Sequence, residues 1–136
     1  MIKLIAGLKG TGKTKTLIAE ANKAIAADQG SVVCVEKGRK LIYDISHKVR
    51  LISSEEYDID SYDRFFGFLC GLMSANYDIT DNFVDSITKI CAPDLDAVEA
   101  FLVKAKKLSD TYNVNISVTI SGDTAAASDG LKAFLA

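Results

Sequence analysis

The stretch GLKGTGKT at residues 7–14 constrains this chain more than any other part of its sequence. It fills every fixed position of the pattern G-x-x-x-x-G-K-[ST], in which a strand leads through a glycine-rich turn into a helix. Gly7 and Gly12 permit backbone angles that other residues resist, so successive N–H groups can point at one anion. A chain of this length meets the pattern by chance on the order of once in a few hundred cases. The motif therefore predicts a phosphate-binding loop.

The residues of this loop have separate expected roles. Lys13 is expected to neutralise the β- and γ-phosphates of a nucleotide, and the Thr14 hydroxyl to ligate Mg²⁺. ATP is the expected nucleotide, with GTP as an open alternative. Lys9 and Lys15 are the least specific members, because both also fit a solvated surface. The predicted nucleotide-binding residues are Gly7, Lys9, Gly10, Thr11, Gly12, Lys13, Thr14 and Lys15.

Strand-like and helix-like patterns alternate along the chain, which predicts one α/β domain over residues 1–136 with a mostly parallel sheet between two helical layers. Apolar residues recur at helical spacing from Lys13 to about Ala27. An aromatic helix is expected to begin at a cap on Asp60 or Ser61, and a later helix to hold Pro93 in its first turn. Strands are expected at 2–6, 31–35, 49–52, 79–84 and 116–121, with 41–44 as a short extra strand and a short helix around 131–135.

The composition of the chain favours a globular protein over a nucleic-acid-binding or membrane-spanning one. The chain is 49% hydrophobic and 25% charged, which is typical of a globular domain. Its net charge of −2 gives no basic field that would recruit nucleic acid. No apolar stretch approaches the length of a membrane span, and no basic and then apolar leader opens the chain. Its three cysteines are far apart, as buried thiols in a cytoplasmic protein would be.

A phosphate loop of this kind needs an acidic group near Mg²⁺, usually at the end of a nearby buried strand. Asp81 and Asp85 compete for this role. Asp85 is favoured because Phe83 and Val84 precede it directly, whereas Asp81 would place an unpaired charge in the middle of a strand. The alternative for Asp85 is a helix or turn cap. Thr14 and Asp85 are therefore the predicted metal ligands.

Hydrolysis also needs a group that orients or deprotonates the attacking water. Many ATPases have a glutamate directly after the metal-binding aspartate, but here that residue is Ser86. Glu36 ends the second apolar strand, and parallel strands bring their carboxyl ends to one edge of the sheet. Glu36 is thus the candidate base, with an exposed turn glutamate beside Lys37 as the alternative. The predicted catalytic residues are Lys13, Glu36 and Asp85.

With these features the chain resembles the RecA-like branch of the P-loop ATPases, which includes recombinases, the clock ATPase KaiC and hexameric helicases. The matching segments are GLKGTGKT, VVCV followed by Glu36, VRLIS and FVDSIT, within residues 1–122. The resemblance implies that Lys13 and Thr14 belong to Walker A, Asp85 to Walker B, and Glu36 to the catalytic base. It also implies about five parallel strands, with the strand ending at Ser121 between the Walker A and Walker B strands. No segment resembles the long DNA-binding loops of recombinases.

Three functions are compatible with this pattern. The first is a Mg²⁺-dependent ATPase whose site a homo-oligomer or a protein partner completes. The second is a nucleotide-binding regulatory or assembly module with little turnover, which Ser86 favours. The third, a small-molecule kinase, usually needs a lid with several arginines, whereas this chain has three scattered ones. Among them, Arg39 fits either a finger at a neighbour's nucleotide or a solvated turn.

Overall fold

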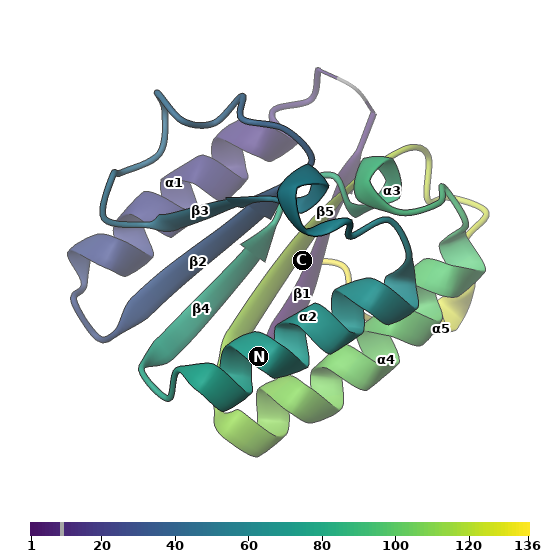
Figure 1. Cartoon of the computed structure of the whole chain (residues 1–136). Coiled ribbons are helices and arrows are strands. Elements are labelled where there is room, and N and C mark those ends of the chain that lie inside the picture. Colours follow the sequence, from purple (N-terminus) through teal and green to yellow (C-terminus); the bar gives the residue numbers. More distant parts are fainter. Residues whose placement is uncertain (9) are drawn as a thin grey trace.

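The computed structural model describes residues 1–8 and 10–136. Its centre is a five-stranded sheet in the order β1-β5-β4-β2-β3, and every neighbouring pair is parallel (Figure 1). The predicted α/β architecture is confirmed, and the last strand does lie between the first strand and β4. The strands are β1 (Ile2–Gly7), β2 (Ser31–Glu36), β3 (Arg50–Ser53), β4 (Ile79–Val84) and β5 (Asn115–Ser121).

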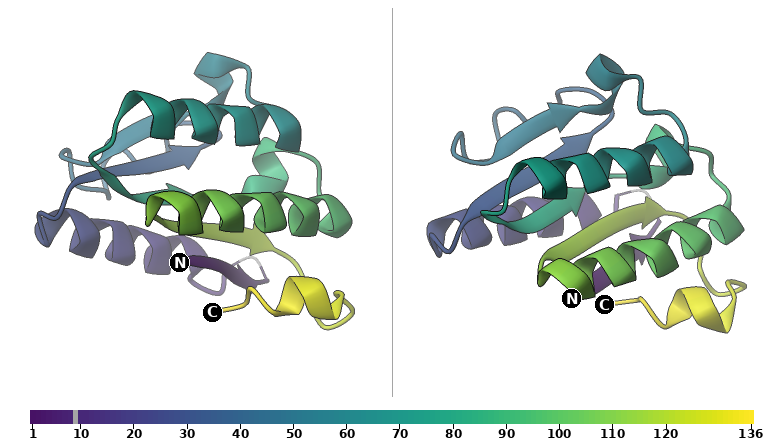
Figure 2. Two further views of the ribbon diagram at one scale, coloured as in Figure 1. Left: turned by 90° about the horizontal axis from the view of Figure 1, so that it is seen from below. Right: turned by 60° about the horizontal axis from the view of Figure 1, so that its bottom comes forward.

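Helices cover both faces of the sheet and give the predicted three layers (Figure 2). On one face α1 (Lys13–Ala26) buries Leu17 and Ala21 against Cys34 and Phe83. On the other face α2 (Tyr62–Ala75) and α4 (Leu95–Tyr112) lie side by side over a larger apolar core. Because both faces are covered, the inner strand β2 is apolar over most of its length. The shorter helices are η1 (Ser54–Tyr57), α3 (Ile87–Ile90) and α5 (Asp129–Lys132).

Side-chain caps fix where the two long helices of this face begin. The Ser61 hydroxyl accepts a hydrogen bond from the Arg64 N–H, so Ser61 is the cap of α2, as one of the two sequence alternatives had it. The Asp94 carboxylate accepts from the N–H groups of Asp96 and Ala97. Since Asp94 is the cap of α4, Pro93 lies before the helix, and its predicted place in the first turn is wrong.

The segment predicted as a short strand at 41–44 is a turn. The N–H groups of Asp44 and Ile45 both donate to the Leu41 carbonyl at 3.0 Å, which folds the backbone back on itself. The side chains of Leu41 and Ile45 are buried with Val49 beside α1. The turn therefore covers the sheet face next to α1, and it adds no strand.

The outer edge of β1 is partly paired by the last residues of the chain. The Leu4 N–H donates to the Phe134 carbonyl at 2.7 Å, and the Ala136 N–H donates to the Leu4 carbonyl at 2.9 Å. The closing helix α5 lies at Asp129–Lys132, slightly earlier than predicted, because Ser128 caps it. Among the described residues, no helix is long and apolar enough to cross a membrane.

Candidate functional site

The carboxyl ends of the parallel strands share one edge of the sheet, where ligands of open α/β folds usually bind. Gly7 ends β1, Glu36 ends β2, and Asp85 directly follows β4. A cavity of about 410 Å³ lies at this edge. It is lined by Gly10, Gly12, Lys13, Thr14, Lys15, Glu36, Lys40, Leu41, Asp85, Lys89 and Ser121. Residues chosen from three distant parts of the sequence therefore meet at one cavity.

The glycine-rich loop has the backbone that its sequence predicts. Gly12 precedes the first residue of α1 and has a φ of 87°, a conformation that L side chains rarely adopt. Gly7 is needed for a different reason, because a Cβ on it would lie 2.5 Å from Thr11 Oγ1. The Thr11 hydroxyl donates to the Leu8 carbonyl at 2.7 Å and so closes the loop. The loop places the N-terminal end of α1, at Lys13 and Thr14, beside the cavity. The first N–H groups of a helix have no partner within the helix, so this end is suited to an anion.

The lysines of the motif occupy different positions. Lys13 Nζ donates to the Leu8 carbonyl at 3.2 Å, and its side chain lines the cavity together with Lys15. Gly7 and Thr11 shape the loop from outside the cavity lining. The expected role of Lys9 lies outside the described residues. A cation at the mouth of a helix N-terminus is suited to an anionic group such as phosphate.

The fold brings Asp85 and Thr14 together in the lining of the cavity. The Thr14 hydroxyl donates to Asp85 Oδ1 at 3.2 Å, although the two residues are 71 positions apart. A second hydroxyl, that of Thr119 on β5, donates to the same oxygen at 3.1 Å. Asp81 lies four residues earlier, within β4 and outside the cavity lining, and its carboxylate accepts from the Asn115 amide at 3.1 Å. Of the two competing aspartates, Asp85 is the one beside the loop.

Glu36 is buried, with 4% of its surface exposed, so the alternative of an exposed turn glutamate is wrong. Its Oε1 accepts from the Lys40 N–H and its Oε2 from the Leu41 N–H, both at 3.0 Å. Burial raises the pKa of the Glu36 carboxyl above its usual value. The two backbone hydrogen bonds act in the opposite direction, and the nearby Asp85 charge adds to the increase. The carboxyl thus faces the cavity while anchoring the turn that follows β2.

The donor set near Thr14 fits Mg²⁺. This ion prefers oxygen ligands and is usually held by one or two carboxylates together with substrate phosphates and water. Thr14 and Asp85 supply one hydroxyl and one carboxylate next to a phosphate-type loop. Over residues 1–8 and 10–136, no group of three or more His, Cys, Asp or Glu side chains could hold a metal ion by itself. The site is therefore suited to a metal that arrives with phosphate.

The positive charges of the cavity are all lysines. Four of them, Lys13, Lys15, Lys40 and Lys89, face two carboxylates, so the lining carries more positive than negative charge. The three arginines lie elsewhere: Arg39 pairs with Glu56, Arg64 pairs with Asp60, and Arg50 is exposed on β3. This excess of positive charge suits a polyanion.

Solved structures of other proteins have a backbone similar to that of this chain. A solved ATPase domain superposes with a TM-score of 0.62 at 11% identity, covering 96% of this chain and 60% of that one. A DnaB-like replicative helicase, studied with its interactions with primase, superposes with a TM-score of 0.61 at 13% identity.

The backbone fold of this chain is similar to that of a solved ATPase domain. This chain spans 60% and 41% of the lengths of these two relatives, and at such identities the likeness establishes the fold alone. No family model matches the sequence. No curated protein matches it either.

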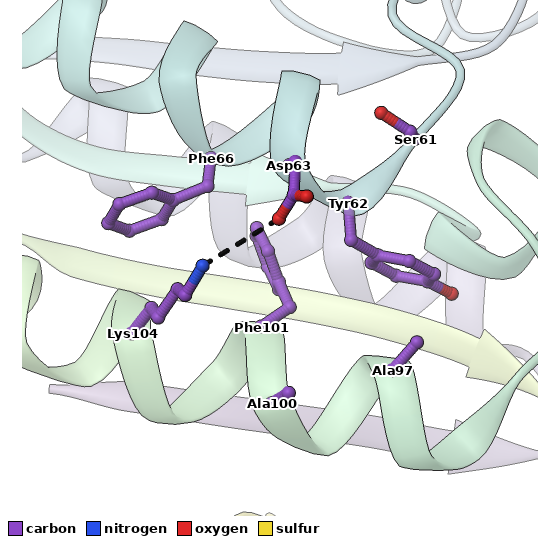
Figure 3. A pocket seen from close by; sticks show the side chains of 8 residues that line it. All are labelled: Ser61, Tyr62, Asp63, Phe66, Ala97, Ala100, Phe101 and Lys104. Atoms are coloured by element: carbon purple, nitrogen blue, oxygen red, sulfur yellow. Dashed lines mark ion pairs between the residues drawn. The ribbon is translucent and has the colours of Figure 1, made fainter.

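A second cavity of about 290 Å³ lies between α2 and α4 on the far side of the sheet (Figure 3). Its lining is mainly aromatic and alanine side chains, and Phe65 and Phe101 pack edge to face beneath it. One ion pair crosses it, from Lys104 Nζ to Asp63 Oδ1 at 3.6 Å. Because most of the lining is apolar and its one lysine lies beside a carboxylate, we assign this cavity to the packing of the two helices.

Three residues of the strand-end site were missed by the sequence interpretation. Thr119 received no role from the sequence, although its hydroxyl lies on the strand expected next to that of Asp85, which was a usable signal. Lys40 and Lys89 had no such signal. The sequence predicted a turn after β2 without a role for Lys40, and it did not predict α3, which carries Lys89.

Proposed function

We propose that this protein binds ATP with Mg²⁺ at the carboxyl edge of its sheet and hydrolyses it. The observation that carries this proposal is the hydrogen bond between Thr14 and Asp85, which joins the phosphate loop to a strand-end carboxylate. The fold of RecA-like ATPase domains supports the same proposal. GTP remains an alternative nucleotide.

The residues of the cavity have separate roles in this proposal: phosphate binding, metal binding and orientation of water. The loop N–H groups and Lys13 bind the β- and γ-phosphates, and Lys15 adds positive charge. Thr14 and Asp85 hold Mg²⁺, which when bound neutralises the charge that develops on the phosphates. Glu36 accepts hydrogen bonds with both oxygens but each oxygen retains a further lone pair, so it can orient a water in the cavity.

Binding and turnover can be tested together. Calorimetric titration with ATP and with GTP, in the presence of Mg²⁺, measures affinity, and phosphate release measures turnover. Lys13→Ala is expected to weaken ATP binding by about tenfold or more and to abolish turnover, because a charge-assisted contact to phosphate is lost. Lys107→Ala, which removes one exposed lysine from α4, is the matched control. Equal ATP binding by Lys13→Ala and the wild type would contradict the proposal.

One observation favours a binding module with little turnover. Ser86 occupies the position directly after Asp85, and both oxygens of Glu36 are engaged by backbone N–H groups. On this alternative, ATP binds tightly but decays in a single turnover no faster than with Lys13→Ala. Robust multiple turnover would exclude it. The kinase alternative has weaker support, because none of the three arginines lines the cavity.

A further inference from the structure

We propose that Thr119 is a positioning residue, which fixes Asp85 for metal binding and ties it to the backbone turn that follows. This inference rests on the proposed function, because it concerns the affinity of the same site for Mg²⁺ with nucleotide. Thr119 belongs to β5 and lies outside the phosphate-loop motif and the strand that carries Asp85.

The position of Thr119 follows from strand register. Val84 of β4 pairs with Val118 of β5, so the next residues along the two parallel strands, Asp85 and Thr119, lie beside each other. Thr119 is completely buried on the sheet face that also carries Ser117. A hydroxyl in this position must find its partners inside the protein, because a buried polar group without a hydrogen bond destabilises the fold.

The Thr119 hydroxyl uses both of its hydrogen-bonding capacities. It donates to Asp85 Oδ1 at 3.1 Å and accepts from the Ser86 N–H at 2.7 Å. Asp85 Oδ1 also accepts from Thr14, so two hydroxyls on different elements hold one carboxylate oxygen. Within residues 1–8 and 10–136, no side-chain hydrogen bond engages Oδ2, which leaves that oxygen for the metal or its water.

The second bond of Thr119 acts on the backbone. Ser86 has φ 55° and ψ 60°, a left-handed conformation that is unfavourable for a residue other than glycine. The bond from its N–H to Thr119 helps to keep it there, and the chain then turns into α3. A single hydroxyl therefore links the Asp85 carboxylate to the turn that starts α3. Groups that orient metal ligands in this way typically affect metal affinity by about 10- to 100-fold.

Two substitutions at this position separate the hydroxyl from the shape of the side chain. Thr119→Val keeps the branched shape and removes the hydroxyl, whereas Thr119→Ser keeps the hydroxyl. Binding of a fluorescent ATP analogue is titrated with Mg²⁺, and a parallel series is measured in excess chelator. Thermal unfolding of each variant is followed under the same conditions.

Thr119→Val is expected to raise the Mg²⁺ concentration for half-maximal nucleotide binding by about tenfold or more. Thr119→Ser is expected to restore it to near the wild-type value, and binding in chelator is expected to be the same in all three proteins. Unchanged Mg²⁺ dependence in Thr119→Val would overturn the role of Thr119. Equal loss of binding with and without Mg²⁺ would also overturn it, by showing a general structural role. Absence of nucleotide binding by the wild type would instead overturn the proposed function.

Discussion

The Glu36 side chain has two roles, one at the cavity and one in the turn that follows β2. Its carboxyl lines the cavity beside the phosphate loop, yet it also caps the turn that starts at Lys37 through the N–H groups of Lys40 and Leu41. A base needs a free lone pair toward water, while a cap needs a fixed orientation. Both are compatible because each carboxylate oxygen can accept more than one hydrogen bond. The structural role predicts a stability effect that a base alone would not produce.

We expect Glu36→Gln to lower the free energy of unfolding by about 1–3 kcal/mol, because the amide NH₂ cannot accept from one of the two backbone N–H groups. Since the pKa of Glu36 is raised in the folded protein, its carboxyl supports the fold most at low pH and less as pH rises through that pKa. The stability difference between the wild type and Glu36→Gln should therefore narrow with increasing pH. Urea unfolding of both proteins across pH 4 to 8 measures it. A stability difference between the two proteins that widens with pH would contradict a raised pKa of Glu36.

The same variant addresses catalysis. If Glu36 is the base, Glu36→Gln binds ATP and Mg²⁺ but loses most of its turnover, measured below its unfolding transition. Full turnover in this variant would remove Glu36 from that role and leave it a purely structural residue.

Among the helices, the short α3 (Ile87–Ile90) places one positive charge, that of Lys89, at the cavity. It begins directly after the left-handed Ser86, and its buried residues Ile87 and Ile90 anchor it on the core. Lys89 lies between these two anchors and faces the cavity. No ion pair to Lys89 is found over the described residues, so its charge is available to an anionic ligand.

Lys89→Ala is expected to weaken ATP binding by about three- to tenfold, because one exposed positive charge near the phosphates is removed. Calorimetric titration measures the effect against Lys107→Ala, which removes the same charge from an exposed position on α4. The difference between the two variants should shrink at high salt, as expected for a screened interaction. Identical ATP affinities of the two variants at low salt would show that α3 contributes no charge to the site.

At the scale of the whole molecule, the cavity has lysines but no arginine from its own chain. Arg39 is paired with Glu56 on the surface, and Arg64 with Asp60. Phosphoryl-transfer enzymes of several classes use an arginine, sometimes supplied by a second protein, to stabilise the transition state. A neighbouring subunit or another protein would then have to supply one here.

We therefore expect specific ATPase activity to rise with protein concentration, in parallel with a shift from monomer to oligomer in sedimentation velocity. Turnover per molecule that stays constant and high while the protein remains monomeric would rule out a shared site. Adding an excess of the Lys13→Ala variant to dilute wild type provides a check, because a neighbour without its own site could still complete the wild-type one.

Much of this organisation was accessible from the sequence. The glycine-rich loop, the alternation of strands and helices and the apolar strand before Asp85 are local patterns, and local patterns report local structure. They predicted the loop, the parallel sheet and the meeting of Gly7, Glu36 and Asp85 at one edge. The errors at Pro93 and at 41–44 arose where a side chain, Asp94 or Glu36, bonds to nearby backbone N–H groups and redirects the chain.

The sequence by itself determined the chemistry available to the site: a loop for an anion, a lysine, a hydroxyl and carboxylates at strand ends. Only the tertiary structure decided which of these groups are hydrogen-bonded to one another. Strand order placed Thr119 beside Asp85, and the turn after β2 buried Glu36. The physical reason is that hydrogen bonds act over about 3 Å. Contacts between residues far apart in the chain therefore depend on sheet order and register, which no local pattern encodes.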